Sequence, residues 1–366
     1  MSGTASRLPQ PRGRGACSGA ASARFGLPAR AIDGDWLDHA LAEDDLPPLR
    51  TTVTEEAARR IIARNASPDI PFSQSINPYR GCEHGCIYCY ARPTHAWLDL
   101  SPGLDFESRL FAKPAAARLL RRELARPGHV PSPIALGTNT DPYQPIEARY
   151  RLTRQILEVC LETGHPVTIT TKSDRVLADL DLLAALAAQG LAAVALSVTS
   201  LDPALSRRLE PRAASPAKRL AALAALAGAG VPAMVNVAPI IPAITDHMLE
   251  EVLAAAAAAG ARHASWIALR LPHEVAPLFR EWLEAHFPDR AAKVMHQVMA
   301  MRGGRDYDAR FFQRMRPEGP WADLVRARFR RAARRLGLNT QRLQLDESRF
   351  RAPARAPANN GQLALF

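Results

Sequence analysis

The sequence lacks the features of a membrane-spanning or secreted protein. It has no run of about 18 apolar residues, so we expect no transmembrane helix and no membrane partner. Residues 1–30 contain five Arg and no acidic residue, as transit peptides do, but they lack the apolar core of a secretory signal. The chain has only five cysteines, and three of them lie within eight residues. This odd, clustered set does not suit secreted disulfides and indicates a cytoplasmic protein with a metal site.

Aromatic and acidic residues are also scarce. Aromatic residues make up 6% of the chain against 47% apolar residues in total, so the core must be built from Ala, Leu, Val and Ile. Asp and Glu number 36 against 47 Lys and Arg, which gives a net charge of +11. Such a basic balance suggests a polyanionic partner, most simply nucleic acid. An Arg-rich composition inherited from a GC-rich genome would give the same charge, and composition alone does not separate the two.

Short apolar runs alternate with amphipathic stretches from about residue 73 to residue 286. Six such pairs predict an α/β fold in which helices cover parallel strands. Because there is no Gly-rich dinucleotide turn, the pattern favours a partial (βα)6 TIM-like barrel, with reactive groups at the carboxyl ends of its strands. The expected strands are 75–80, 133–138, 167–172, 193–200, 233–241 and 263–271, and the expected helices are 107–125, 151–163, 175–189, 216–228, 246–259 and 273–286.

The barrel is expected to span residues 51–287, including a short helix at 55–64. Residues 1–50 show no steady period and are expected to form a disordered basic tail. Residues 288–340 are expected to form an Arg-rich helical extension, since residues 302–335 hold eleven Arg against four acidic residues. Residues 341–366 are expected to be a flexible tail that ends in QLALF.

Three cysteines, Cys82, Cys86 and Cys89, follow the first strand on one loop. Three thiolates can bind three irons of a cubane cluster and leave the fourth iron open to a substrate or cofactor. Cys17 lies in the N-terminal tail, and Cys160 lies on the apolar face of a helix, so neither is placed to complete the set. The alternative is a Cys3His zinc site with His84 or His95, but zinc motifs usually come as two separated pairs.

The CxxxCxxC spacing, with an aromatic residue before the last cysteine, resembles the radical S-adenosylmethionine (radical SAM) superfamily. Between about residues 70 and 337, NPYRGCEHGCIYCYARP, GTNTDPYQPIE, TITTKS, LSVTS, LEP and VAPIIP occur in the order seen in the subgroup related to spore photoproduct lyase. The resemblance implies a [4Fe–4S] cluster, S-adenosylmethionine and an external electron donor. It also implies reductive cleavage of the cofactor to a 5′-deoxyadenosyl radical, which takes a hydrogen atom from the substrate.

The resemblance also assigns cofactor contacts. Tyr88 matches the aromatic residue near the adenine, and Thr140 and Asp141 match the polar pair that binds the amino group. Lys172 matches the partner of the carboxylate, and Ser197 matches the ribose ligand. A packed loop aromatic, an Asp-Pro turn and a solvated strand end are the structural alternatives. The apolar wall beside the adenine is matched by Ala238 and Ile240, which are equally suited to strand packing.

One position departs from the lyase. Thr138 stands where the lyase carries a hydrogen-donating cysteine. A hydroxyl does not readily give its hydrogen to a carbon radical, because the O–H bond is too strong. The resemblance therefore supports the initiating chemistry and not the lyase's full reaction, and no catalytic residue is assigned.

The late basic segment is the candidate nucleic-acid surface. RLPHE (270–274) ends the sixth strand on the substrate side, and GGRDYDARFF (303–312) follows. Arg binds phosphate and Tyr stacks on bases, which makes Arg302, Arg305, Tyr307 and Arg310 candidates. A solvated Arg-rich surface is the alternative. Three functions stay open: a radical enzyme in DNA repair or modification, a radical enzyme acting on a protein or small molecule, and a non-catalytic metal-binding nucleic-acid module.

The last five residues form a separate motif. Gln362, Leu363, Leu365 and Phe366 resemble the pentapeptide by which bacterial replication and repair proteins dock on the DNA sliding clamp. Its Gln offers hydrogen bonds and its apolar side chains fill a pocket. A tail that folds back on its own barrel is the alternative.

Overall fold

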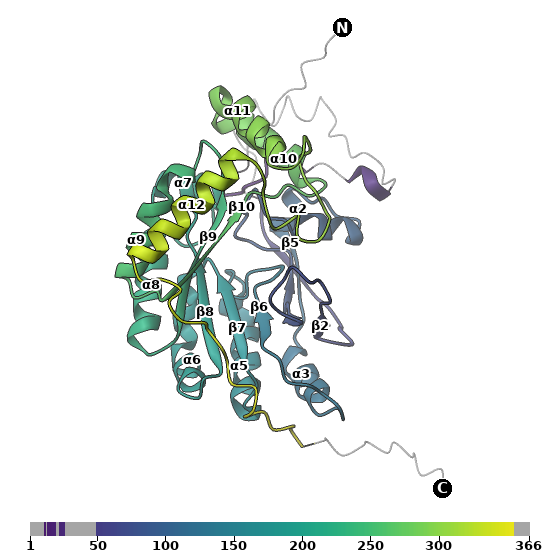
Figure 1. Ribbon diagram of the computed structural model, residues 1–366. Coiled ribbons are helices and arrows are strands. Elements are labelled where there is room, and N and C mark those ends of the chain that lie inside the picture. Colours follow the sequence, from purple (N-terminus) through teal and green to yellow (C-terminus); the bar gives the residue numbers. More distant parts are fainter. Residues whose placement is uncertain (1–10, 12, 20–21, 26–48, 355–366) are drawn as a thin grey trace.

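A seven-stranded sheet organises the protein (Figure 1). The computed structural model describes residues 11, 13–19, 22–25 and 49–354. The strand order is β10-β9-β8-β7-β6-β3-β2, in which all neighbours are parallel except β2 and β3. The expected six parallel strands in chain order are confirmed, and the sheet is an open partial barrel. The strands are β2 (Ile62–Arg64), β3 (Gln74–Ile76), β6 (Ile134–Leu136), β7 (Val167–Thr171), β8 (Ala192–Ser197), β9 (Ala233–Ile240) and β10 (His263–Ala268).

Helices cover the outer face of this sheet. Their apolar sides pack on strands that read as buried runs, such as β8, where all six residues are buried. Ser215 caps one of these helices, α8, by accepting from the backbone N–H of Lys218. The covering helices are α3 (Ala116–Leu124), α5 (Leu152–Thr163), α6 (Leu180–Ala187), α8 (Pro216–Gly228), α9 (Leu249–Ala258) and α10 (Val275–His286). Shorter segments are η1 (Ala23–Phe25), η2 (Arg92–Leu98), α2 (Leu104–Ser108), α4 (Glu147–Tyr150), η3 (Asp174–Asp179), α7 (Pro203–Leu209) and η4 (Asp246–Met248).

A second, three-stranded sheet corrects three sequence expectations. It has the order β1 (Thr52–Glu55), β5 (Arg109–Ala112), β4 (Tyr79–Arg80). The helix expected at 55–64 is wrong, because its ends pair as β1 with β5 and as β2 with β3. The helix expected at 107–125 is interrupted by β5 for the same reason: pairing with distant strands overrides local helix propensity. The strand expected at 75–80 is divided at Pro78 between the two sheets.

The described parts of both tails are packed on the core, while the disorder expected for 1–50 and the flexibility expected for 341–366 remain predictions for the rest of each tail. Ala16 is fully buried, and Arg14 donates to the backbone carbonyl of Glu107. At the other end, the backbone N–H of Arg351 donates to Thr163 O (2.8 Å), and the ring of Phe350 packs on His129 and His165. In both places the core supplies acceptors or an apolar surface for the tail. The QLALF motif lies outside the described residues.

Two helices extend the barrel beyond α10. They are α11 (Pro288–Ala300) and α12 (Pro320–Arg335), and α12 is joined to α9 by the ion pair of Arg328 with Glu250. The residues between them, 301–319, form turns near the carboxyl ends of the strands, so the expected extension is only partly helical. Within the described part of the chain, no helix has both the length and the apolar character needed to span a bilayer.

Candidate functional site

The three clustered cysteines lie on a loop that follows β4. Cys82 and Cys86 are buried and Cys89 is partly buried. The backbone N–H of Cys82 donates to Phe106 O (2.9 Å), and that of Cys89 donates to Cys86 O (3.1 Å). Within this loop, hereafter the cluster loop (residues 81–89), Ile87 N–H also donates to Leu209 O (3.1 Å). Backbone hydrogen bonds therefore fix the positions of the three thiols.

The donor set suits a cubane cluster better than a single ion. In the described ranges, no three His, Cys, Asp or Glu side chains converge as the ligands of one metal ion would. A cubane needs no such convergence, because each thiolate binds a different iron. The two histidines of the zinc alternative are engaged elsewhere: His84 faces Asp141 (3.3 Å), and His95 Nε2 lies 2.9 Å from Arg109 O.

Burial affects the chemistry of these thiols. It raises the pKa of Cys82 well above the ordinary value, and it raises the pKa of Cys86 to about 12 against the opposing charge of Lys172. Both thiols therefore hold their protons at neutral pH unless a metal displaces them. Cys160, on α5, is also buried, and burial alone raises its pKa to about 12.

A buried ion pair lies beneath the cluster loop. The side chains of Arg92 and Glu107 are both fully buried and form a salt bridge. Glu107 also accepts from the backbone N–H groups of Gly15 (2.8 Å) and Ala16 (2.9 Å). The pair thus ties the N-terminal segment to the loop. The guanidinium of Arg92 donates to four backbone carbonyls, those of Gly85, Cys86, Pro102 and Gly103.

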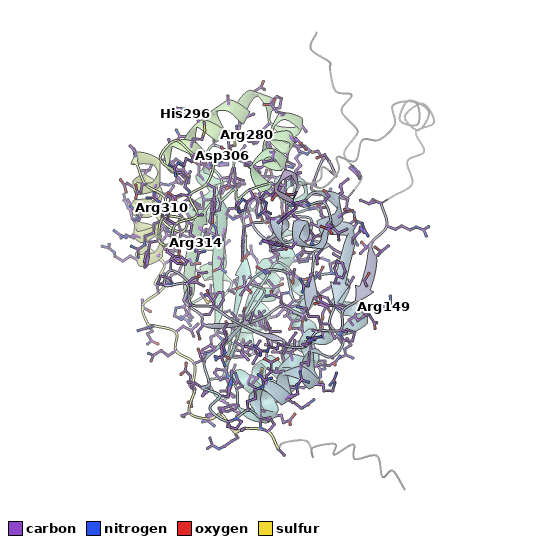
Figure 2. The ribbon with its side chains drawn as sticks, turned by 90° about the vertical axis from the view of Figure 1, so that its right-hand side faces the viewer. Arg149, Arg280, His296, Asp306, Arg310 and Arg314 are labelled. Carbon is purple, nitrogen blue, oxygen red and sulfur yellow. The ribbon has the colours of Figure 1, made fainter. Side chains whose placement is uncertain are left out.

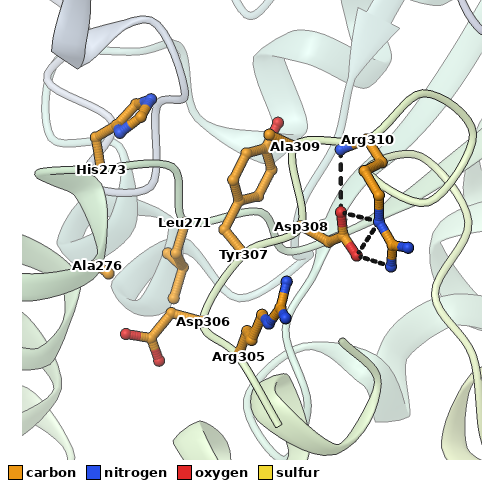
Figure 3. Close-up of a pocket in the computed structure, with 9 residues that line it drawn as sticks. All are labelled: Leu271, His273, Ala276, Arg305, Asp306, Tyr307, Asp308, Ala309 and Arg310. Carbon is orange, nitrogen blue, oxygen red and sulfur yellow. Dashed lines mark hydrogen bonds and ion pairs between the residues drawn. The ribbon is translucent and has the colours of Figure 1, made fainter. Parts of the chain in front are cut away.

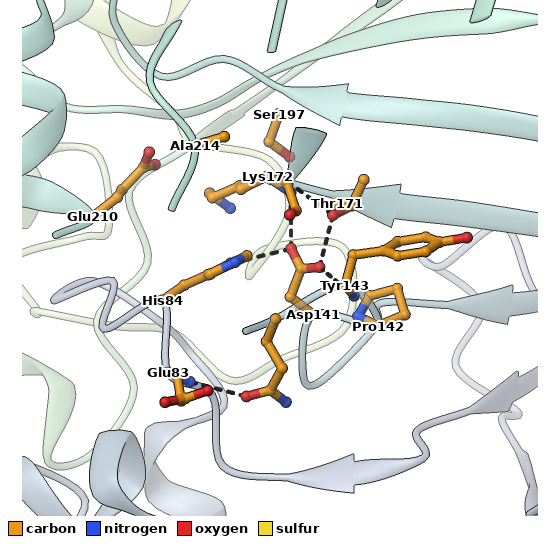
Figure 4. A network of polar contacts seen from close by, with 12 residues as sticks. Glu83, His84, Asp141, Pro142, Tyr143, Thr171, Lys172, Ser197, Glu210 and Ala214 are labelled. Atoms are coloured by element: carbon orange, nitrogen blue, oxygen red, sulfur yellow. Dashed lines mark hydrogen bonds and ion pairs between the residues drawn. The ribbon is translucent and has the colours of Figure 1, made fainter. Parts of the chain in front are cut away.

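The loop after β6 holds the cluster loop from the other side (Figure 4). The Asp141 carboxylate accepts from Thr171 Oγ1 (2.7 Å) and from the backbone N–H of Lys172 (2.8 Å). It also accepts from the N–H of Tyr143 (2.9 Å) and lies 3.3 Å from His84 Nδ1. Burial acts to raise the pKa of Asp141, but His84 and the other donors outweigh it and hold that pKa at about 2.

Gln144 also joins the loop after β6 to the cluster loop. Its Oε1 accepts from the N–H of Glu83 (2.9 Å), and its Nε2 donates to Gly81 O (3.2 Å). The Thr140 hydroxyl is directed to Tyr79 O (3.2 Å). Protein donors thus occupy the Asp141 carboxylate, which gives this residue a role in positioning the loop. Contact of Thr140 and Asp141 with a cofactor amino group remains a prediction.

A second buried network lies beside Tyr88. Glu210 accepts hydrogen bonds from the side chains of Tyr88, Thr199 (2.7 Å) and Arg219. Arg219 also donates to Ser197 O (2.9 Å). Glu210 belongs to the LEP motif, but nothing in that motif predicted that its carboxylate would accept hydrogen bonds from these three side chains.

The remaining cofactor candidates lie around this network. The Lys172 ammonium lies 5.8 Å from the centre of the Tyr88 ring. Burial acts to lower the pKa of Lys172, but the Cys86 thiol and the Glu210 carboxylate outweigh it and raise that pKa. Thr199 Oγ1 lies 3.2 Å from Ala238 O, and Ile240 is buried further along β9. Lys172, Ser197 and Ala238 therefore lie at or near the carboxyl ends of the neighbouring strands β7, β8 and β9, and Lys172 is close to Tyr88 on the cluster loop.

The basic candidates divide into exposed and buried residues. Arg310 and Arg314 lie on one side of the molecule (Figure 2). Arg305, Tyr307 and Arg310 line a cavity of about 500 Å³ beyond β10 (Figure 3). Arg302 is only 5% exposed, so it does not belong to a solvated surface. The other lining residues are Leu271, His273, Ala276, Asp306, Asp308 and Ala309.

The comparisons with known proteins agree with this fold and site. The family model described as "Radical SAM superfamily" matches residues 76–256, which contain the cluster loop and strands β4 to β9. Residues 76–256 thus form a radical SAM domain, and members of this superfamily use a [4Fe–4S] cluster and S-adenosylmethionine.

Individual relatives refine this placement. The uncharacterized protein Rv2578c of Mycobacterium tuberculosis is 40% identical over 226 residues, which cover 61% of this chain and 66% of the relative. The uncharacterized protein MJ0683 of Methanocaldococcus jannaschii is 32% identical over 171 residues, which cover 47% of this chain and 61% of the relative. The match thus spans less than two thirds of either relative.

Solved structures of spore photoproduct lyase share the fold. The lyase complexed with a dinucleoside spore photoproduct gives a TM-score of 0.56 at 18% identity, covering 78% of this chain and 80% of the lyase. A lyase variant with bound AdoMet and the dinucleoside spore photoproduct gives a TM-score of 0.56 at 15% identity, covering 83% of this chain and 92% of the variant. At this identity the likeness establishes a common fold.

Proposed function

We propose that this protein is a radical SAM enzyme that acts on nucleic acid in DNA repair or modification. The observation that carries the initiating chemistry is the set of three fixed thiols of Cys82, Cys86 and Cys89 beside the polar strand ends. When bound, the cluster and S-adenosylmethionine supply an electron and a 5′-deoxyadenosyl radical that takes hydrogen from substrate. The protein's part is to hold the cluster loop, orient the cofactor and exclude water.

The cofactor contacts follow from the placement of the strand ends. Lys172 is the proposed partner of the cofactor carboxylate, because its cationic side chain lies beside Tyr88 and Cys86. Tyr88 and Ser197 are proposed to contact adenine and ribose. The apolar wall is assigned to Ala238 and Ile240. Thr140 and Asp141 are proposed to act mainly by holding the cluster loop toward the amino group.

The nucleic-acid substrate rests on three observations. The net charge is +11, and Arg305, Tyr307 and Arg310 line the cavity beyond β10. The fold is that of a lyase solved with a dinucleoside photoproduct. Because Thr138 replaces the hydrogen-donating cysteine, we do not extend the lyase's own reaction to this chain. A protein or small-molecule substrate is the second candidate, favoured if the Arg-rich surface binds no nucleic acid; a non-catalytic module does not fit an enzyme superfamily.

Two further proposals concern the setting of the enzyme. We place it in the cytosol, where an external donor reduces the cluster and where five free thiols persist. We also propose that the last five residues dock on the DNA sliding clamp, through Gln362, Leu363, Leu365 and Phe366. Such docking would raise the local concentration of the enzyme at DNA.

The initiating reaction is tested with the anaerobically reconstituted, reduced enzyme. We expect wild type to convert S-adenosylmethionine to 5′-deoxyadenosine. Lys172→Met should weaken cofactor binding by about tenfold or more while the cluster absorbance remains, because a charge-assisted contact is lost. Lys218→Met is the matched control, since Lys218 is 68% exposed on α8. Equal cofactor affinity in wild type and Lys172→Met would contradict the assignment of Lys172.

The substrate class is tested by isotope transfer in the same reaction. Deuterium should move into 5′-deoxyadenosine from deuterated DNA oligonucleotides. Transfer only from a peptide or a small metabolite would replace the nucleic-acid proposal with the second candidate.

The docking proposal is tested with a fluorescent peptide of residues 355–366. We expect it to bind a bacterial sliding clamp, and we expect Leu365→Ala with Phe366→Ala to abolish binding, because both side chains are needed to fill an apolar pocket. A peptide with Asn359→Ala is the control. Binding that persists in the double variant would remove this partner.

A further inference from the structure

Arg302 is a buried cation with unused hydrogen-bond donors. Its side chain is 95% buried, and its Nη1 donates to Gln313 O (2.6 Å). Its Nε and Nη2 are also buried, and no atom of the described residues accepts a hydrogen bond from either. No carboxylate forms an ion pair with it in the part of the chain that the structure describes, since nearby Asp308 pairs with Arg310. A buried guanidinium in this state is costly unless an acceptor of opposite charge joins it.

A second cation lies close to it. Arg270 follows β10, and its guanidinium lies 4.6 Å from the centre of the Tyr90 ring. Arg270 Nη1 also contacts Met315 Sδ (3.0 Å), again without an acidic partner among the described residues. Burial lowers the pKa of Arg302, and the charge of Arg270 lowers it further. Two guanidinium groups therefore lie near enough to repel one another, and neither forms an ion pair with a carboxylate of the described residues.

Their position connects the cavity to the cluster loop. Tyr90, under Arg270, directly follows Cys89. On the other side, Tyr307 and Asp308 are close enough to act electrostatically on Arg302, and both line the cavity of Figure 3. The two guanidinium groups thus have neighbours both beside the cluster loop and in the lining of the cavity.

We propose that Arg302 and Arg270 form a binding site for one oxyanion of the substrate, and that this oxyanion is a phosphate of the nucleic acid. The unused groups of Arg302 are all donors, so the ligand must be an acceptor. The paired positive charges select an anion over water, and guanidinium groups match the geometry of phosphate and carboxylate alike. The choice of phosphate rests on the proposed function. The site fixes one phosphate close to the cluster, in contrast to the exposed Arg305 and Arg310.

The anion site is tested with the reconstituted enzyme and inorganic phosphate as the probe. Phosphate should raise the Tm of wild type and should leave that of Arg302→Met unchanged. Without phosphate, Arg302→Met should unfold at the same or a higher temperature than wild type, because an unpaired buried charge has been replaced by an apolar side chain. Arg330→Met, on the exposed face of α12, is the matched control and should respond to phosphate like wild type.

Other results would overturn the site. One is an equal rise in Tm with phosphate in wild type and Arg302→Met. The other is a lower Tm of Arg302→Met than of wild type without phosphate, which would show that Arg302 acts in packing. If Arg302→Met does not fold, Arg270→Met and Arg302→Lys take its place, and each should reduce the phosphate response.

The source of the oxyanion is tested with oligonucleotides that carry one uncharged methylphosphonate linkage. The neutral linkage is placed at each position in turn. At one position it should weaken oligonucleotide binding to wild type by about tenfold and should not change binding to Arg302→Met. A phosphate response that depends on Arg302, with no oligonucleotide binding, would keep the anion site and remove the nucleic-acid substrate. If the oligonucleotide affinity does not change in Arg302→Met or with any neutral linkage, the phosphate site is wrong but the proposed function stands.

Discussion

Replacement of Cys82, Cys86 or Cys89 with Ala will abolish the iron–sulfur absorbance of the anaerobically reconstituted protein. Wild type should hold about four irons and four sulfides per chain, because three thiolates on one loop anchor a single cubane. Two thiolates are insufficient here, since the nearby His84 and His95 side chains face Asp141 and the Arg109 carbonyl. The measurement is iron and sulfide content together with visible absorbance.

The remaining cysteines provide the controls. Cys160→Ala changes a thiol inside the packing of α5, and Cys17→Ala changes one in the N-terminal segment. Both should retain four irons. Stoichiometric zinc without iron-dependent absorbance in wild type would show that the cubane assignment is wrong.

Glu107→Ala will have the largest effect on stability. It leaves Arg92 fully buried without its acidic partner, which costs about 3–5 kcal/mol of unfolding free energy. It also removes the acceptor for the backbone N–H groups of Gly15 and Ala16. Urea unfolding of the cluster-free protein measures the loss.

An exposed ion pair is the matched control. Glu162→Ala breaks the pair with Arg121, in which both side chains are nearly half exposed, and should cost about 0–1 kcal/mol. Equal losses in Glu107→Ala and Glu162→Ala would contradict the structural role of the buried pair.

A double variant separates stability from cluster retention. Arg92→Met with Glu107→Leu removes both charges and should recover much of the stability lost in Glu107→Ala. It still lacks the donors to the carbonyls of Gly85 and Cys86, so it should lose its cluster faster in air than wild type. The decay of visible absorbance measures this rate.

The sequence predicted the strands of the main sheet well, because parallel strands buried on both faces read as short apolar runs. It failed at 55–64 and 109–112, where strand formation depends on partners far along the chain. The three cysteines were visible as a motif. The residues that hold their loop were not, since Arg92, Glu107 and Gln144 have ordinary local contexts and acquire their roles only through contacts made by folding.

Asp141 illustrates what a sequence motif leaves open about a residue's contacts. As part of GTNTDPYQPIE, it was expected to contact the cofactor. The fold surrounds its carboxylate with three hydrogen-bond donors and His84. A sequence motif gives the type of a residue and its position after a strand. Which donors bind its carboxylate depends on contacts that form only in the folded protein.

The packed C-terminal segment, residues 346–351, lies at the end of the sheet opposite to the cluster loop. The N–H groups of Asp346 and Arg351 bind carbonyls just before β8 and β7 begin, at the amino ends of the strands (Figure 1). The cavity and the cluster loop lie at the opposite ends. Twelve residues follow the last described residue, Ala354, and extended they span at most about 40 Å. If the proposed docking on the sliding clamp occurs, the cavity and the cluster loop would face away from the anchored segment.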